Sequence, residues 1–135
     1  MHASPFADLE RPVAVVCHDA GAANIILSWL SAAGLDGCRI YLKGPAAQLW
    51  SLRLPVSALA DTLKAALWGC ETLISGTGWE SDLEHRARLL ARDRTINSIA
   101  VLDHWVNYAQ RFERGGVTVL PDEIWVTDDY ARARA

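Results

Sequence analysis

Polar residues that can act on a small ligand come directly after several apolar segments of this chain of 135 residues. His18 and Asp19 follow the first apolar run, and Asp103 and His104 follow a later one. A carboxylate or an imidazole in such a position can take a proton from a hydroxyl group, which is the role of a general base. We therefore expect Asp19, Asp103 and His104 to be catalytic candidates and His18 to contact the ligand.

Two further segments combine glycine with groups that form hydrogen bonds. Residues 18–24 are rich in small side chains, which would let an anion such as phosphate approach the N-terminus of the next helix. Residues 75–80 offer hydroxyls, a carboxylate and close backbone approach. Neither segment matches a dinucleotide fingerprint or a P-loop, and the alternative interpretation is that both are turns, with Asp19 capping a helix. The ligand-binding candidates in them are His18, Gly21, Asn24, Ser75, Gly76, Thr77, Gly78 and Glu80.

A third polar set is expected on one helix face. If residues 104–112 are helical, His104, Asn107, Tyr108 and Arg111 share a face at positions i, i+3, i+4 and i+7. Arg111 could hold a phosphate or a carboxylate in bidentate fashion. A solvated helix face is the alternative.

The pair Asp128 and Asp129 lacks the spacing of a metal site, so we expect no metal and no cofactor. One of the two carboxylates is expected to cap a helix that begins at Tyr130.

The apolar segments predict the elements that would position these residues. Continuous apolar runs favour strands covered on both faces, and helical patterns lie between them. The pattern predicts an α/β fold of the three-layer α/β/α, doubly wound, Rossmann-like kind, with a mostly parallel sheet of five to six strands. The expected strands lie at 13–17, 39–42, 72–75, 98–102 and 123–126, with a short edge strand at 54–56.

In such sheets, ligands bind outside the carboxyl ends of the strands, where the strand order reverses. We expect the strands at 13–17 and 72–75 to flank this switch point, and Gly21, Thr77 and Asp103 to line one crevice. Residues 1–12 are expected to form a tail and 13–135 a single domain.

Other local signals predict how the helices begin and end. A helix after Gly21 is expected to end at Gly34. After a break at Gly44 and Pro45, a short helix is expected at 46–52, and Ser57 is expected to cap a later helix that stops at Gly69. Ser81 and Glu84 form a capping box. On the helix that follows this capping box, the i,i+4 pairs are Asp82 with Arg86 and Glu84 with Arg88.

Composition limits the classes of partner. The net charge is −3, and no basic stripe interleaves with aromatic residues, so nucleic acid is not an expected partner. No apolar stretch reaches the roughly 18 residues of a membrane span, and no secretory signal is visible. Cys17, Cys38 and Cys70 lack metal-ligand spacing and are expected to be buried thiols, which favours a cytoplasmic location.

The order of these features resembles a known class. The stretch from the Ser-Gly-Thr-Gly loop to Asp103 and His104, together with the segment from Pro121 to Tyr130, is similar to the N-terminal Rossmann-like half of GT-B glycosyltransferases and of UDP-GlcNAc 2-epimerases. The loop after the first strand is Asp-Ala-Gly-Ala where the family has a fuller glycine cluster, and the nucleotide-sugar half is absent. The resemblance implies an acceptor-side half that binds a sugar or a phosphate-bearing ligand in polysaccharide biosynthesis. The donor would be held by a C-terminal domain or a partner chain, so the chain would not be catalytic alone.

Two other functions fit the same residues. One is a self-contained, flavodoxin-like module that binds a nucleotide or a sugar phosphate. The other is a small hydrolase or isomerase with His104 or His18 as the base. Trp79 and Trp105 near the rim of an open cleft would favour pairing with a second copy in a symmetric dimer.

Overall fold

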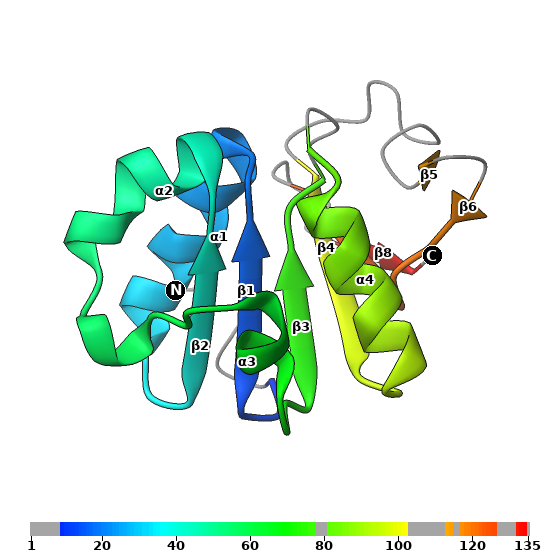
Figure 1. Cartoon of the computed structure of the whole chain (residues 1–135), viewed down its shortest axis with the longest axis horizontal. Coiled ribbons are helices and arrows are strands. Elements are labelled where there is room, and N and C mark those ends of the chain that lie inside the picture. The colour runs from blue at the N-terminus through cyan, green and yellow to red at the C-terminus, as the bar shows by residue number, and fades with distance from the viewer. Residues whose placement is uncertain (1–8, 78–80, 103–112, 115–116, 127–131, 135) are drawn as a thin grey trace.

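The computed structural model describes residues 9–77, 81–102, 113–114, 117–126 and 132–134. They form a six-stranded sheet in which every pairing is parallel except the last, which is antiparallel (Figure 1). In spatial order the strands are β2 (Cys38–Leu42), β1 (Val13–Cys17), β3 (Thr72–Ser75), β4 (Asn97–Leu102), β7 (Glu123–Val126) and β8 (Arg132–Arg134). The five parallel strands occur where the sequence predicts strands.

The strand order reverses between β1 and β3. From β1 the chain crosses to β2 on one side, and from β2 it returns past β1 to β3 on the other. Val13 is in register with Thr72, and Val16 with Ser75. The prediction that these two strands are parallel neighbours at the switch point is confirmed.

Helices cover both faces of the sheet, which gives the predicted three layers. Figure 1 shows α3 (Leu63–Leu67) and α4 (Leu83–Asp93) in front of the sheet and α1 (Ala20–Ala33) behind it. Along β1, Val13, Val15 and Cys17 pack with α1, whereas Ala14 and Val16 pack with α3 and α4. This alternation explains the continuous apolar run, because a strand with helices on both sides has no solvent face.

The first helix matches its prediction, and the connection from β2 to β3 matches only in part. Gly34, at φ 100, ends α1 as expected. The short helix expected at 46–52 is present as α2 (Gly44–Trp50). It begins earlier than expected, because Gly44 and Pro45 do not break the chain and proline fits the first turn of a helix. Two short 3₁₀ turns follow, η1 (Ser51–Arg53) and η2 (Val56–Ala58).

Two further predictions in this connection are wrong. The expected strand at 54–56 is absent, since Leu54 and Pro55 only join the two 3₁₀ turns. Ser57 caps nothing, and the helix begins later, where the Thr62 side chain accepts a hydrogen bond from the Ala65 N–H. Threonine at this position satisfies an N–H group that the first helical turn leaves open.

The end of the described chain also departs from expectation. Arg132–Arg134 is not helical but forms β8, antiparallel to β7. Alanine and arginine favour helices, but pairing with the open edge of a formed sheet outweighs that local preference. A short antiparallel ladder that the sequence did not predict joins β5 (Glu113–Arg114) and β6 (Val117–Thr118). Within the described chain, no helix is long and apolar enough to cross a membrane.

Candidate functional site

A buried carboxylate links the two loops at the switch point. Glu84, in the first turn of α4, is 1% exposed. Its Oε2 atom accepts hydrogen bonds from the backbone N–H groups of His18, at 3.1 Å, and Asp19, at 3.5 Å. The capping box predicted that this side chain would turn back toward its own helix, but Oε2 lies on the loop that follows β1. Glu84 therefore ties α4 to the start of α1.

Arg88, one turn further along α4, holds the other loop. Its guanidinium is buried, and Nη1 donates to Ser75 Oγ at 3.2 Å and to the Gly76 carbonyl at 2.8 Å. From their place on α4, Glu84 and Arg88 thus connect the loops that follow β1 and β3. We call these two residues the α4 clasp. Charged side chains are rarely fully buried unless they are paired, so their place at the switch point marks a specialised region.

The clasp carboxyl can gain or lose a proton near neutral pH. Burial raises the pKa of Glu84 from its ordinary 4.5 to about 7, and the negative charge of Asp19 adds to the rise. The N–H groups of His18 and Asp19 and the positive charge of Arg88 limit it. Burial, followed by the charge of Glu84, also raises the pKa of the Cys17 thiol well above its usual value. Such perturbed carboxyls are more frequent at functional sites than elsewhere.

Two glycines permit close approach at this edge. A Cβ on Gly76 would lie 2.1 Å from Glu84 Oε2 and 3.0 Å from the Ala22 Cβ. Gly44 has φ 54, and a Cβ there would lie 2.4 Å from Nε2 of His18. The sequence assigned Gly76 to the ligand, and in the structure it makes room for the clasp.

The sequence-predicted residues near β1 take different positions. Asp19 caps α1, since its Oδ2 atom accepts a hydrogen bond from the Ala22 N–H at 3.0 Å. His18, Asp19 and Gly21 are half-buried and reach the surface. Asn24 is directed at α2, where its Oδ1 atom accepts from Trp50 Nε1 at 2.9 Å.

The candidates after β3 lie inside the protein. Ser75 is fully buried against Arg88. Thr77, 1% exposed, donates from Oγ1 to the Val101 carbonyl at 3.1 Å, which ties the β3 loop to β4. Gly21 and Thr77 lie at the same edge of the sheet, because each follows one of two parallel neighbours.

The remaining site predictions lie outside the described residues, as does the expected helix at 104–112. The residues concerned are Gly78, Glu80, Asp103, His104, Asn107, Tyr108 and Arg111. Asp128 and Asp129 are also outside the described chain. Among the described residues, no group of three or more His, Cys, Asp or Glu side chains could hold a metal ion. The three cysteines are free and buried, as predicted.

The α4 clasp is the feature that the sequence reasoning missed. Glu84 and Arg88 were interpreted as a cap and a helical charge pair. The signal that could have found them is their spacing with Ala87 and Ala91, because these four residues share one helix face at i, i+3, i+4 and i+7. Two small residues beside two charges on that face indicate close packing against the sheet.

Comparisons with protein-family models, with curated proteins and with solved structures find no match to this chain. The class that the structure defines is therefore the general one, a Rossmann-like α/β fold with a parallel sheet and alternating helices.

Proposed function

We propose that the carboxyl edge of β1 and β3 binds a small, uncharged, hydroxyl-rich ligand, a sugar, and that the chain is the acceptor-side half of a glycosyltransferase-like enzyme. One observation carries the choice of ligand: the carboxylate of Glu84 already takes up the N–H groups of His18 and Asp19.

This arrangement disfavours a phosphate at the start of α1. In nucleotide-binding folds, open N–H groups at a helix N-terminus receive the phosphate. Here the Asp19 side chain takes the N–H of Ala22, and Glu84 takes those of His18 and Asp19. The Asp19 carboxylate, together with Glu84 when it is ionised, would repel a bound anion. A neutral sugar avoids that repulsion, and its hydroxyls can donate to carboxylate oxygens.

The half-buried side chains above the clasp have suitable chemistry for an acceptor. Asp19 offers a carboxylate and His18 an imidazole at the end of β1. A carboxylate or an imidazole within hydrogen-bond reach of an acceptor hydroxyl can remove its proton as the glycosidic bond forms. Asp103 and His104, which follow β4 in the sequence and lie outside the described residues, would supply a second carboxylate and a second imidazole in this proposal. The glycosyl donor would come from a second domain or chain.

A ligand panel tests the choice of sugar. We expect free sugars, such as N-acetylglucosamine and methyl glycosides, to raise the melting temperature, whereas sugar phosphates and nucleotides do not. A ligand at 100 times its dissociation constant stabilises a protein by about 2.7 kcal/mol, which is readily measured. Stabilisation by nucleotides or sugar phosphates alone would contradict the proposal and favour a phosphate-binding module.

Two matched variants test whether the sugar binds at the end of β1. Asp19→Asn keeps a helix cap but removes the charge, so it should weaken sugar binding with little loss of stability. Asp36→Asn removes the same charge from an exposed turn between α1 and β2, at the opposite edge, and should change nothing. Equal effects of the two variants would argue against a site at β1. Multiple-turnover glycosyl transfer by the chain alone would contradict the half-enzyme role.

A further inference from the structure

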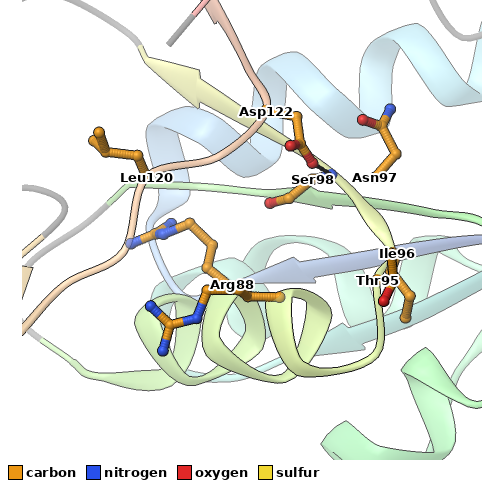
Figure 2. A pocket seen from close by; sticks show the side chains of 8 residues that line it. Arg88, Thr95, Ile96, Asn97, Ser98, Leu120 and Asp122 are labelled. Carbon is orange, nitrogen blue, oxygen red and sulfur yellow. Dashed lines mark hydrogen bonds between the residues drawn. The ribbon is translucent and has the colours of Figure 1, made fainter.

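A cavity lies near the amino ends of β4 and β7, away from the carboxyl edge. Its volume is about 360 Å³, within the roughly 300–1,000 Å³ that is usual for small-molecule sites. Figure 2 shows α4, with Arg88, on one side and β4 with the segment before β7 on the other. The lining residues are Arg88, Arg92, Thr95, Ile96, Asn97, Ser98, Leu120 and Asp122.

The cavity wall contains a buried hydroxyl that the fold does not use. Ser98 is 5% exposed, and its Oγ atom has no hydrogen-bond partner among the described residues. Most buried polar side-chain atoms are hydrogen-bonded, because leaving one unsatisfied is unfavourable. An alanine would fill this position without that penalty. A ligand that forms a hydrogen bond with Ser98 Oγ would explain why a serine stands at this position.

Charges of opposite sign line the cavity. Arg92, which is exposed, brings a guanidinium from α4. Asp122, also exposed, brings a carboxylate from the sheet side, where its Oδ2 atom accepts the Ser98 N–H at 2.7 Å. In the described part of the chain these two side chains form no salt bridge with each other. The exposed amide of Asn97 adds donors and an acceptor near the same rim.

The backbone beside the cavity is also unusual. Thr95, which turns the chain from α4 into β4, has φ 59. A β-branched residue is costly in this left-handed region, where glycine or asparagine would be easier. Strained residues of this kind concentrate at ligand sites.

We propose that this cavity binds a small zwitterion of the α-amino acid type, with its carboxylate at the Arg92 guanidinium, its ammonium group at the Asp122 carboxylate and a polar atom at Ser98 Oγ. Arginine suits a carboxylate because its planar donors match the two oxygens. This proposal does not depend on the proposed sugar site. One residue is common to the two regions, because Arg88 lines the cavity and also bonds to Ser75 and Gly76 at the carboxyl edge.

A panel of α-amino acids tested with the full chain examines this directly. We expect at least one amino acid to raise the melting temperature, while its 2-hydroxy acid and its amine without the carboxyl group do not. Calorimetry then gives the dissociation constant of that amino acid. No stabilisation by any amino acid would overturn the proposal, as would equal stabilisation by the 2-hydroxy acid, because the ammonium group would then play no part.

Variants locate the binding. Arg92→Gln and Asp122→Asn should each raise the dissociation constant about tenfold or more, a change of about 1.4 kcal/mol in binding free energy. The asparagine still offers an oxygen to the Ser98 N–H, so folding is preserved. Arg94→Gln is the control, because that guanidinium lies over the Trp68 ring at 5.9 Å and does not line the cavity.

Ser98→Ala separates the ligand role from a structural one. It should leave the free protein as stable as before or more stable, since it removes a hydroxyl without a partner, and yet weaken amino acid binding. Binding that is unchanged in Arg92→Gln, Asp122→Asn and Ser98→Ala would place the ligand elsewhere and overturn the proposal.

Discussion

Between α1 and the sheet, Leu27, Ile74 and Trp125 belong to a cluster of apolar side chains. The space between α4 and the sheet also has an apolar cluster, but it encloses Glu84 and Arg88 as well. The α1 side depends on shape and apolar burial, whereas the α4 side adds charges that must be paired. The proposed amino acid site borders α4, and the proposed sugar site lies where Glu84 of α4 meets the start of α1, so α4 takes part in both sites.

The largest effect should come from breaking the α4 clasp. Arg88→Leu leaves the buried Glu84 without its countercharge and should cost about 3–5 kcal/mol of unfolding free energy at a pH above 7. The double variant Glu84→Gln/Arg88→Leu should recover much of that loss, because glutamine is uncharged and still accepts an N–H. Urea unfolding of the three proteins measures both steps.

The control on the other face is Leu27→Ala. Truncating this fully buried leucine should cost about 2–5 kcal/mol, and Glu84→Gln should not restore it. Equal rescue of Leu27→Ala and Arg88→Leu, or strictly additive losses in the clasp, would mean that the two faces do not differ as described.

A smaller effect should appear in the pH dependence. The pKa of Glu84 is about 7 in the folded protein and near 4.5 when unfolded, so the native state holds this proton more tightly. Its contribution to stability is complete below pH 4.5 and is lost as the pH rises toward 7. At about 1.4 kcal/mol per pKa unit, the loss is about 3 kcal/mol.

Glu84→Gln should remove this slope. Unfolding free energies of wild type and variant, measured by urea titration from pH 4.5 to 8, give the difference directly. Leu27→Ala should lower the whole curve but keep the wild-type slope. If the difference between wild type and Glu84→Gln is constant over this pH range, Glu84 does not titrate as its surroundings imply.

The smallest effect belongs to the outer face of the same helix. Asp82 and Arg86 form the predicted i,i+4 ion pair at 3.1 Å, with side chains 58% and 55% exposed. Solvent screens such a pair, so Arg86→Ala should change stability by about 0.5 kcal/mol or less. A loss greater than that of Arg88→Leu would reverse the contrast between the buried pair and the exposed one.

The sequence predicts the framework of the fold because local patterns determine it. β1 is a continuous apolar run, apolar residues fill the centres of β3 and β7, and Gly34 marks the end of α1. The failures occur where distant partners decide the structure. β8 forms because β7 offers an open edge, and the connection from β2 to β3 is made of short turns whose apolar spacing has no clear period.

The site was predicted less fully for a related reason. The carboxyl edge follows from parallel strands, so His18 and Asp19 could be placed there from sequence. Glu84 and Arg88 have the same spacing as Asp82 and Arg86, and only the packing of α4 on the sheet distinguishes the buried pair from the exposed one. In the sequence, Ser98 has the pattern of an ordinary strand residue. The cavity beside it forms only when α4 and the segment before β7 pack together, so local sequence could not predict it.

The contact between Trp29 and Trp125 has an optical consequence. Their ring centroids are 6.1 Å apart, with the planes inclined at 57°. Two indoles this close couple their electronic transitions, which adds a circular dichroism component that is lost when either ring is replaced. One ring belongs to the first helix and the other to the last parallel strand, so the signal requires both ends of the chain to have assembled. Stopped-flow circular dichroism that follows this component would show when α1 and β7 come together during folding, without any added dye.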